Sequence, residues 1–417
     1  DRESGRVEEE QIRGGGFLSY NALPTLMYNF IKDNDDDIES GGGGDSSTGD
    51  AIRNTLNGYT FGQPRCEGDI DLSFNLWSDN DAAYGNTLST SGFTGSLDMS
   101  NSIFDVYNCP EEEVTPVWVD VEEEVEVDFQ YSAGDLCSIT EDVWVSPDGD
   151  DYLNTGTSQS NAFKTIDVAL QLIAPDSLNT ITVNLTEGTF SPSTTGESFP
   201  IIMISNVNLK GAGDEVTILD AESTSRVIEL NDLDNVSVQD LTITGGNTLT
   251  NGVTSSGYSG GGMSLAGSGI IKNVIIRDNY SQYTAGGLYI GWDGQALFQN
   301  VQIINNEAGA GGGIYIDSAR PVFYKALIAD NYASGDGGGL CIVYGGHPFI
   351  INSTIVNNES GDFCGGILLN NNTSGQVLNS VVRNNHSYEI YFYPDFATNE
   401  LTLSYSNIKG GEAGIVT

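Results

Sequence analysis

Two stretches of this chain, aligned with each other, decide its fold: GGLYIGWDGQALFQNVQIINN at residues 286–306 and GGIYIDSARPVFYKALIADN at residues 312–331. Each stretch begins with a glycine pair and alternating apolar residues, and each ends on a pair of Asn or Asp residues. Short alternating runs broken by Gly, Asn and Pro are typical of β-strands joined by turns. Because the unit repeats, we predict a solenoid in which each repeat forms one coil.

Five such repeats follow one another from residue 260, at intervals of 25 to 27 residues. Their first apolar residues are Met263, Leu288, Ile314, Leu340 and Ile367. The β-branched residues three before the closing residue are Ile276, Ile303, Ile328, Ile355 and Val382. The apolar residues eight before it are Ile271, Phe298, Phe323, Ile350 and Val377. A unit of about 26 residues is too short for a four-stranded propeller blade. We therefore predict an all-β fold, a parallel β-helix with these rows inside.

The glycine pairs and the closing Asn residues predict how the coils turn. We expect glycine to supply positive φ at the turns. We expect stacked Asn side chains to form amide hydrogen-bond ladders from coil to coil, with a role in binding a ligand as the alternative. The closing residues are Asn279, Asn306, Asn331, Asn358 and Asn385.

The rest of the chain predicts two solenoid segments. Residues 143–417 form the second one, and apolar residues at helical spacing in FKTIDVALQLIAP predict a short capping helix near 163–174. Residues 1–108 form the terminal coils of a first solenoid, because GGGFLSYNALPTLMYNFIKDN at 14–34 fits the same template. In residues 109–142 valines alternate with acids, which predicts an acidic β linker between the two solenoids.

Composition restricts the partners of this protein. Its 417 residues include 58 Asp or Glu and 15 Lys or Arg, a formal net charge of −43, which argues against nucleic acid or an anionic membrane as partner. No apolar run is long enough for a transmembrane segment. The acidic start shows no cleavable signal, which indicates a mature or partial chain. The five cysteines are too few for a disulfide scaffold, and pairing of Cys109 with Cys137 stays open against two unpaired thiols.

Three acidic loops are candidate calcium sites, since calcium prefers several flexible oxygen ligands. The candidates are Asp148, Asp150 and Asp151 in one loop, Asp79 and Asp81 in a second, and Asp35 with its acidic neighbours in a third. None has the full EF-hand pattern, and the alternative is a set of solvated acidic turns. Calcium is the one cofactor that the sequence suggests.

Residues for catalysis show no converging pattern. The basic residues of the repeats have no common spacing with acids, as a lyase would need. Asp278 and Asp330 stand about two coils apart in the turn slot that Asn305 fills between them, and we expect turn residues there. His347 and His386 are isolated, and we expect both in solvated turns. We expect Tyr289 and Tyr315 to contact sugar rings or to pack beside the core; their aromatic neighbours are Trp292, Tyr283 and Tyr332.

The stretch WVSPDGDDYLNTGTSQSNAFKTIDVALQLI at residues 144–173 resembles the entry motif of secreted bacterial right-handed parallel β-helix proteins, with Asn161-Ala162 where the family has a proline. The repeats resemble those of polymorphic outer membrane proteins and of surface proteins exported by the type IX route. The resemblance covers residues 143–417 well and 14–108 loosely. It implies an extracellular or cell-surface bacterial protein, on a fold that hosts lyases, hydrolases, adhesins and tailspikes.

The sequence therefore favours a non-catalytic secreted or cell-surface structural protein that serves adhesion, a surface coat or a filament. Its expected partners are other copies in head-to-tail assembly, or the rest of a larger tandem β-helix protein. Two alternatives remain. One is a carbohydrate-active enzyme of the pectate lyase type, and the other is a polysaccharide-binding module.

Overall fold

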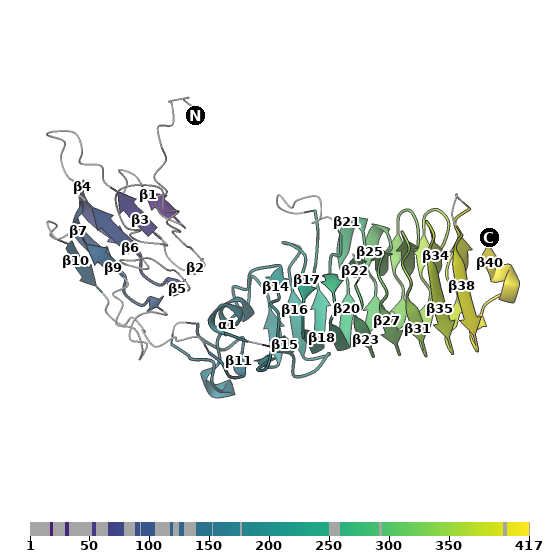
Figure 1. Ribbon diagram of the computed structural model, residues 1–417, viewed down its shortest axis with the longest axis horizontal. Helices are drawn as coiled ribbons and strands as arrows, with labels where there is room; N and C mark the ends of the chain where they lie inside the picture. The colour runs from purple at the N-terminus through teal and green to yellow at the C-terminus, as the bar shows by residue number, and fades with distance from the viewer. Residues whose placement is uncertain are drawn as a thin grey trace, which may run out of the picture. The chain divides into compact units, whose positions relative to one another are not determined.

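The computed structural model describes residues 17–19, 30–32, 52–55, 66–78, 88–91, 93–104, 117–119, 125–128, 139–151, 153–175, 177–249, 259–291, 294–394 and 398–416. The chain divides into two compact units, residues 1–139 and residues 140–417. Strands account for most of the described elements, and the α-helical content is a single short helix, α1. Figure 1 labels these elements.

The described residues of unit 1 form three small parallel sheets. Their strands are β1 (Phe17–Ser19), β3 (Ile52–Thr55), β6 (Leu88–Ser91) and β9 (Val117–Val119) in the first sheet, β4 (Cys66–Asp71), β7 (Phe93–Asp98) and β10 (Val125–Asp128) in the second, and β2 (Phe30–Lys32), β5 (Leu76–Ser78) and β8 (Ile103–Phe104) in the third. Strands β9 and β10 come from the stretch predicted as a linker, yet they pair in parallel with β6 and β7. These residues therefore extend the sheets of unit 1.

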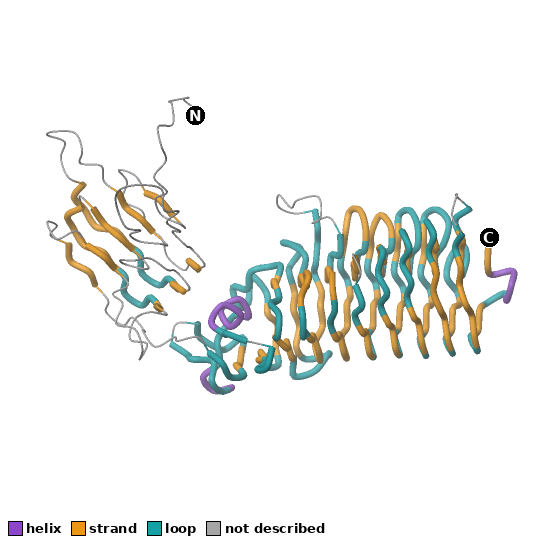
Figure 2. Tube along the Cα trace, in the orientation of Figure 1, coloured by secondary structure: helices purple, strands orange, loops and turns teal. Residues whose placement is uncertain are grey.

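Unit 2 is a parallel β-solenoid whose coils average about 27 residues. Figure 2 shows its strands at the same place in successive coils. The strands of its long sheet are β11 (Val143–Val145), β12 (Ile181–Leu185), β13 (Gly188–Phe190), β15 (Val207–Lys210), β16 (Thr217–Asp220), β18 (Ser237–Thr244), β20 (Ile270–Arg277), β23 (Leu297–Gln299), β24 (Gln302–Ile304), β27 (Val322–Tyr324), β28 (Leu327–Ala329), β31 (Phe349–Ile351), β32 (Thr354–Val356), β35 (Ser374–Leu378), β36 (Val381–Arg383), β38 (Glu400–Ser404) and β39 (Asn407–Ile408).

Two further sheets complete the coils. The nine-stranded sheet contains β14 (Ile201–Ile202), β17 (Ile228–Leu233), β19 (Met263–Gly267), β22 (Leu288–Gly291), β26 (Ile314–Asp317), β30 (Leu340–Val343), β34 (Ile367–Leu369), β37 (Ile390–Phe392) and β40 (Ile415–Val416). The four-stranded sheet contains β21 (Tyr280–Thr284), β25 (Glu307–Ala310), β29 (Tyr332–Ala333) and β33 (Glu359–Ser360). Two 3-10 turns, η1 (Gln159–Asn161) and η3 (Gly411–Gly414), are the other helical elements among the described residues.

The strand register confirms the apolar rows predicted from the repeat. Met263 pairs with Leu288, and the row continues through Ile314, Leu340 and Ile367. The two rows of the long sheet are in register in the same way. All fifteen side chains in these rows are at most 1% exposed. The solenoid core is therefore a stack of like residues on like residues.

The predicted cap helix is present as α1 (Ile166–Leu172), and its apolar residues Ile166 and Ala169 are fully buried. Thr165 is the N-cap residue, and its side chain accepts a hydrogen bond from the Val168 N–H. The buried carboxylate of Glu197 accepts hydrogen bonds from the N–H groups at the start of the helix. Burial raises the pKa of Glu197 to about 8, against the opposing effect of those N–H groups.

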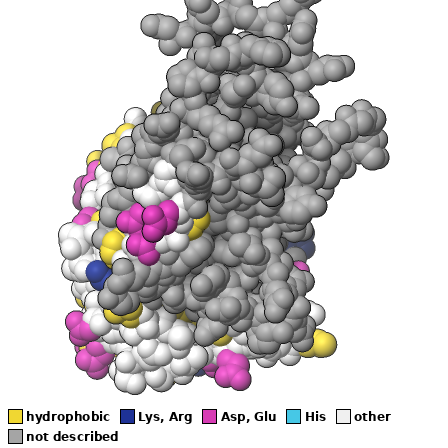
Figure 3. Space-filling view, turned by 90° about the vertical axis from the view of Figure 1, so that its left-hand side faces the viewer, with side chains coloured by type: hydrophobic (Ala, Val, Ile, Leu, Met, Phe, Trp, Pro, Cys, Tyr) yellow, Lys and Arg dark blue, Asp and Glu magenta, His cyan; other side chains and the backbone are white. Residues whose placement is uncertain are grey.

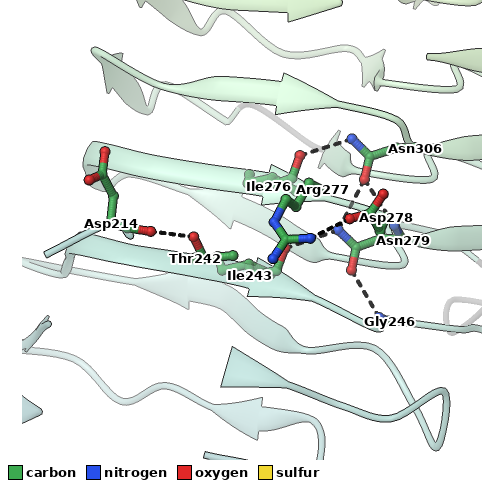
Figure 4. Close-up of polar contacts among 9 residues, drawn as sticks. All are labelled: Asp214, Thr242, Ile243, Gly246, Ile276, Arg277, Asp278, Asn279 and Asn306. Atoms are coloured by element: carbon green, nitrogen blue, oxygen red, sulfur yellow. Dashed lines mark hydrogen bonds and ion pairs between the residues drawn. The ribbon is translucent and has the colours of Figure 1, made fainter. Parts of the chain in front are cut away.

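The closing Asn residues form the predicted amide ladder inside the solenoid (Figure 4). Each Asn Nδ2 donates to the Oδ1 of the next coil's Asn at 2.9–3.0 Å and also to a backbone carbonyl of the coil before. Each Oδ1 in turn accepts the backbone N–H of the preceding Asn. At the C-terminal end of the ladder, Glu389 takes the role that an Asn of a further coil would have. Its carboxylate accepts hydrogen bonds from both the backbone N–H and the Nδ2 of Asn385. The buried amides are thus satisfied from coil to coil.

The glycine pairs act differently from the prediction. None of the ten pair residues, 261–262, 286–287, 312–313, 338–339 and 365–366, has positive φ, but the glycines directly before three of the pairs, Gly260, Gly311 and Gly337, supply it as expected. A Cβ on Gly338 would lie 2.2 Å from the carbonyl oxygen of Glu359 in the next coil, and one on Gly339 would lie 3.0 Å from the Asn358 Nδ2. The pairs therefore allow adjacent coils and the Asn ladder to approach closely. Positive φ is supplied mainly by Asn and Asp at the corners, such as Asn305 and Asp330.

Candidate functional site

A row that includes three tyrosines lies on the outer side of the nine-stranded sheet, between the inward rows. Its residues are in register from coil to coil, in the order Ser264, Tyr289, Tyr315, Cys341, Leu368 and Tyr391. Tyr289 and Tyr315 stack with ring centroids 6.1 Å apart and planes 13° apart. The row follows from period-two alternation, because each of these residues stands between two inward-facing apolar residues.

Further aromatic rings gather at the C-terminal end of this row. Phe363 stacks on Tyr391 at 5.3 Å and meets Tyr393 edge-on at 5.7 Å, and Tyr388 stacks on Tyr391 at 5.9 Å. Phe363 and Tyr388 are each 39% exposed. The buried residues Cys341, Val343, Cys364 and Leu368 form an apolar cluster against which Tyr315 and Tyr391 pack. We call the rings of Tyr289, Tyr315, Phe363, Tyr388, Tyr391 and Tyr393 the aromatic strip.

Three carboxylates accompany the strip. The Asp317 carboxylate hydrogen-bonds to Tyr289, and burial together with this carboxylate raises the pKa of Tyr289 to about 12. Asp336 and Asp362 are close enough in neighbouring coils for their charges to interact. Burial, and next the charge of Asp362, raise the pKa of Asp336, while the Phe363 N–H opposes the shift. The Asp336 Oδ1 is buried without a hydrogen-bond partner in the part of the chain that the structure describes.

Basic residues lie elsewhere on these coils. The strands of the nine-stranded sheet, as described, contain no Lys or Arg. Between residues 261 and 394 the sequence has five basic residues, and four of them belong to β20, to β36 or to the turn between β27 and β28 of the long sheet. The fifth, Arg320, is in the connection from β26 to β27. The basic residues are Lys272, Arg277, Arg320, Lys325 and Arg383.

The two described free cysteines are not suited to nucleophilic chemistry. Cys341 and Cys364 are both buried in the cluster beneath the aromatic strip. Burial raises the pKa of the Cys364 thiol to about 12 and shifts the Cys341 thiol in the same direction. A thiolate is therefore disfavoured at both positions. Cys109 and Cys137, whose pairing the sequence left open, lie outside the described residues.

The loop with Asp148, Asp150 and Asp151 is the predicted calcium site that the structure describes. Asp151 accepts hydrogen bonds from the Lys164 and Thr165 N–H groups at 2.7 and 3.0 Å, which fixes the start of the cap helix. Asp150 accepts the Leu153 N–H at 3.0 Å, and Asp148 is exposed. Among the described residues no group of three or more His, Cys, Asp or Glu side chains could hold a metal ion. The candidates Asp79, Asp81 and Asp35 lie outside the described residues, and calcium stays a prediction.

The other residues singled out from the sequence do not converge. Asp278 and Asp330 are exposed corner residues with positive φ, and Asp278 pairs with Arg277 (Figure 4). His347 contacts the Ser374 hydroxyl on the long-sheet side, and His386 is exposed. Tyr283 and Tyr332 belong to the four-stranded sheet, so they are separate from the aromatic strip. Trp292 lies outside the described residues.

Sequence reasoning missed the rings of Phe363, Tyr388, Tyr391 and Tyr393. The coil that carries most of them lacks the glycine pair, so it does not fit the repeat pattern. Asp336 and Asp362 had a visible signal, because Ser-Gly-Asp occurs at both 334–336 and 360–362, 26 residues apart. Such a spacing equals one coil and places the two carboxylates in equivalent loops.

One family model agrees with this architecture. Residues 261–417 match the family model described as the right-handed β-helix region. A pectin methylesterase variant in complex with a hexasaccharide is 14% identical, with a TM-score of 0.35, over 61% of this chain and 82% of that one. Pectin methylesterase PemA from Erwinia chrysanthemi has 14% identity, a TM-score of 0.36 and the same coverage. The carrot pectin methylesterase has 12% identity and a TM-score of 0.36, over 66% and 85% of the two chains. No curated protein matches the chain.

The described helices include none that is long and apolar enough to span a membrane. In the end view of Figure 3, acidic side chains form several groups on the described surface, and few basic ones are visible. This distribution agrees with the excess of acids in the sequence.

Proposed function

We propose that unit 2 is a non-catalytic polysaccharide-binding solenoid of a secreted or cell-surface protein. The observation that carries this proposal is the aromatic strip, in which stacked and partly exposed rings follow the solenoid axis over several coils. Aromatic rings offer large rigid apolar faces with polar edges, which suits them to the alternating apolar and hydroxyl surfaces of sugars. A row of such rings on a regular scaffold fits a linear polymer better than a compact ligand.

The scaffold supports this role through its rigidity. The strip is fixed by strand register beneath it and by the buried cluster around Cys341 and Leu368. Preorganised rings lose little conformational entropy when a ligand binds. Adhesion, surface coating and head-to-tail assembly with other copies are uses of such a solenoid that stay predictions.

One observation favours a second candidate, a carbohydrate-active enzyme. Asp336 and Asp362 are two neighbouring carboxylates, and the pKa of Asp336 is raised, which is the pattern of an acid and base pair in glycoside hydrolysis. Incubation of the protein with an oligosaccharide separates the two candidates. A binding module retains an intact oligosaccharide, whereas an enzyme releases shorter, unsaturated or de-esterified products that mass spectrometry detects.

The test is isothermal titration of the protein with a panel of linear hexasaccharides, neutral, acidic and amino-substituted. Phe363→Ala and Tyr391→Ala are expected to weaken binding at least fivefold each, because each removes one stacking face. Tyr324→Ala, on the outer side of the long sheet, is the matched control and is expected to leave affinity unchanged. Binding that survives both strip variants, or no binding to any glycan, would contradict the proposal.

A further inference from the structure

We propose that the aromatic strip selects a glycan that carries free amino groups, a polymer of amino sugars with unblocked ammonium groups. This inference rests on the proposed function and specifies its ligand class. It is argued from aromatic rings and carboxylates that lie together on the nine-stranded sheet, whose described strands carry no basic residue.

Two carboxylates lie next to Phe363, one of the two most exposed residues of the strip. The Asp336 carboxylate accepts the Phe363 N–H, and its Oδ1 is buried without a hydrogen-bond partner among the described residues. Asp362 directly precedes Phe363 and is exposed, so its carboxylate is the one that a ligand cation reaches. At the other end of the strip Asp317 is bound to Tyr289. Carboxylates alone would not define a site, but the rings supply the surface on which a sugar lies.

Ammonium groups are recognised by this combination of groups. A cation over an aromatic face is attracted by the negative face of the ring. A carboxylate next to that ring adds a charge-assisted hydrogen bond. Burial is the larger cause of the raised pKa of Asp336, and the charge of Asp362 adds to it, so an ammonium group bound between the two carboxylates would relieve the repulsion between them.

The same carboxylates would repel an acidic glycan. A uronic acid polymer would place its carboxylates against Asp317, Asp336 and Asp362, with no Lys or Arg on the described strands of this sheet to compensate. The nearest basic groups in sequence belong to the long sheet or to the connection at Arg320. The net charge of −43 also favours a cationic glycan at long range, because the protein as a whole attracts polycations and repels polyanions.

The experiment compares three hexasaccharides by isothermal titration with the full chain at pH 6 and low salt. The probes are hexaglucosamine, its fully N-acetylated counterpart and hexagalacturonate. We expect hexaglucosamine to bind at least tenfold more tightly than either of the others, and we expect this preference to shrink as salt is added. Asp336→Asn and Asp362→Asn are each expected to lower the affinity for hexaglucosamine about fivefold or more.

The control is Asp330→Asn, which removes an equal charge at an exposed corner of the long sheet. It is expected to leave the affinity within twofold of the parent, and thermal melts verify that all variants fold. Equal or tighter binding of the N-acetylated or the uronic hexamer, lost in Phe363→Ala, overturns this inference and keeps the proposed function. The absence of binding to all three probes overturns both. Equal losses in Asp336→Asn and Asp330→Asn also overturn it, since only general charge attraction would then be at work.

Discussion

The buried Asn ladder predicts a large and position-specific loss of stability when one rung is removed. Asn358 is fully buried, donates to Ile328 and Asn385, and accepts both the N–H and the Nδ2 of Asn331. In Asn358→Ala the Asn331 N–H, one Asn331 amide hydrogen and the Ile328 carbonyl lose their partner. At about 1–3 kcal/mol for each buried unsatisfied group, and with some relaxation, we expect a loss of about 3–6 kcal/mol.

The control is the adjacent residue, because Asn357 is exposed at a corner with φ 58°. Asn357→Gly keeps that backbone conformation accessible and is expected to change stability by less than about 0.5 kcal/mol. Urea unfolding followed by far-ultraviolet circular dichroism measures both variants under the same conditions. Similar losses at the two positions would refute the ladder as a source of stability.

Three further predictions concern the coils, the cap and the acidic loop. Gly338→Ala places a Cβ 2.2 Å from a carbonyl oxygen of the next coil and should cost more than about 2 kcal/mol, whereas Gly269→Ala, with its nearest neighbour at 3.6 Å, should be nearly neutral in thermal melts. The pKa of Glu197 is raised from 4.5 to about 8 in the folded protein, so its contribution to stability is fully present below about pH 4.5 and is lost as the pH rises through about 8. The difference in unfolding free energy between the parent and Glu197→Gln should therefore fall across that window, and a pH-independent difference would contradict the assignment. Millimolar calcium should raise the melting temperature beyond the effect of sodium chloride at equal ionic strength; identical responses to the two salts would leave only screening.

The repeat made the core predictable, because one residue type in one slot of five coils fixes both the strand register and the inward face. Ile303 and Ile328 were assigned to the interior from spacing alone, and they pair there. The role of the glycine pairs was not predictable in the same way. Spacing shows that a small residue is needed, but only the approach of adjacent coils shows that Gly338 leaves room for a carbonyl oxygen.

The candidate site was less visible in the sequence because it uses the irregular part of the solenoid. Tyr289 and Tyr315 occupy a repeated slot and were found, whereas Phe363 and Tyr391 meet only after a loop and a shortened coil. The Asp336 and Asp362 pair depends on loops that return to the same side of the solenoid. Periodicity therefore predicts what repeats, and tertiary structure decides which non-repeating residues meet.

The most direct test of the aromatic strip as a glycan-binding surface is hydrogen exchange of the full chain with and without saturating hexaglucosamine, read by mass spectrometry at peptide resolution. Binding at the strip predicts slower exchange in peptides that cover residues 334–337, 360–366 and 388–393. Peptides from β27, β28, β31 and β32 of the long sheet should exchange at unchanged rates. Protection confined to the long sheet, or saturation of the ligand with no protection at the strip, would contradict the account.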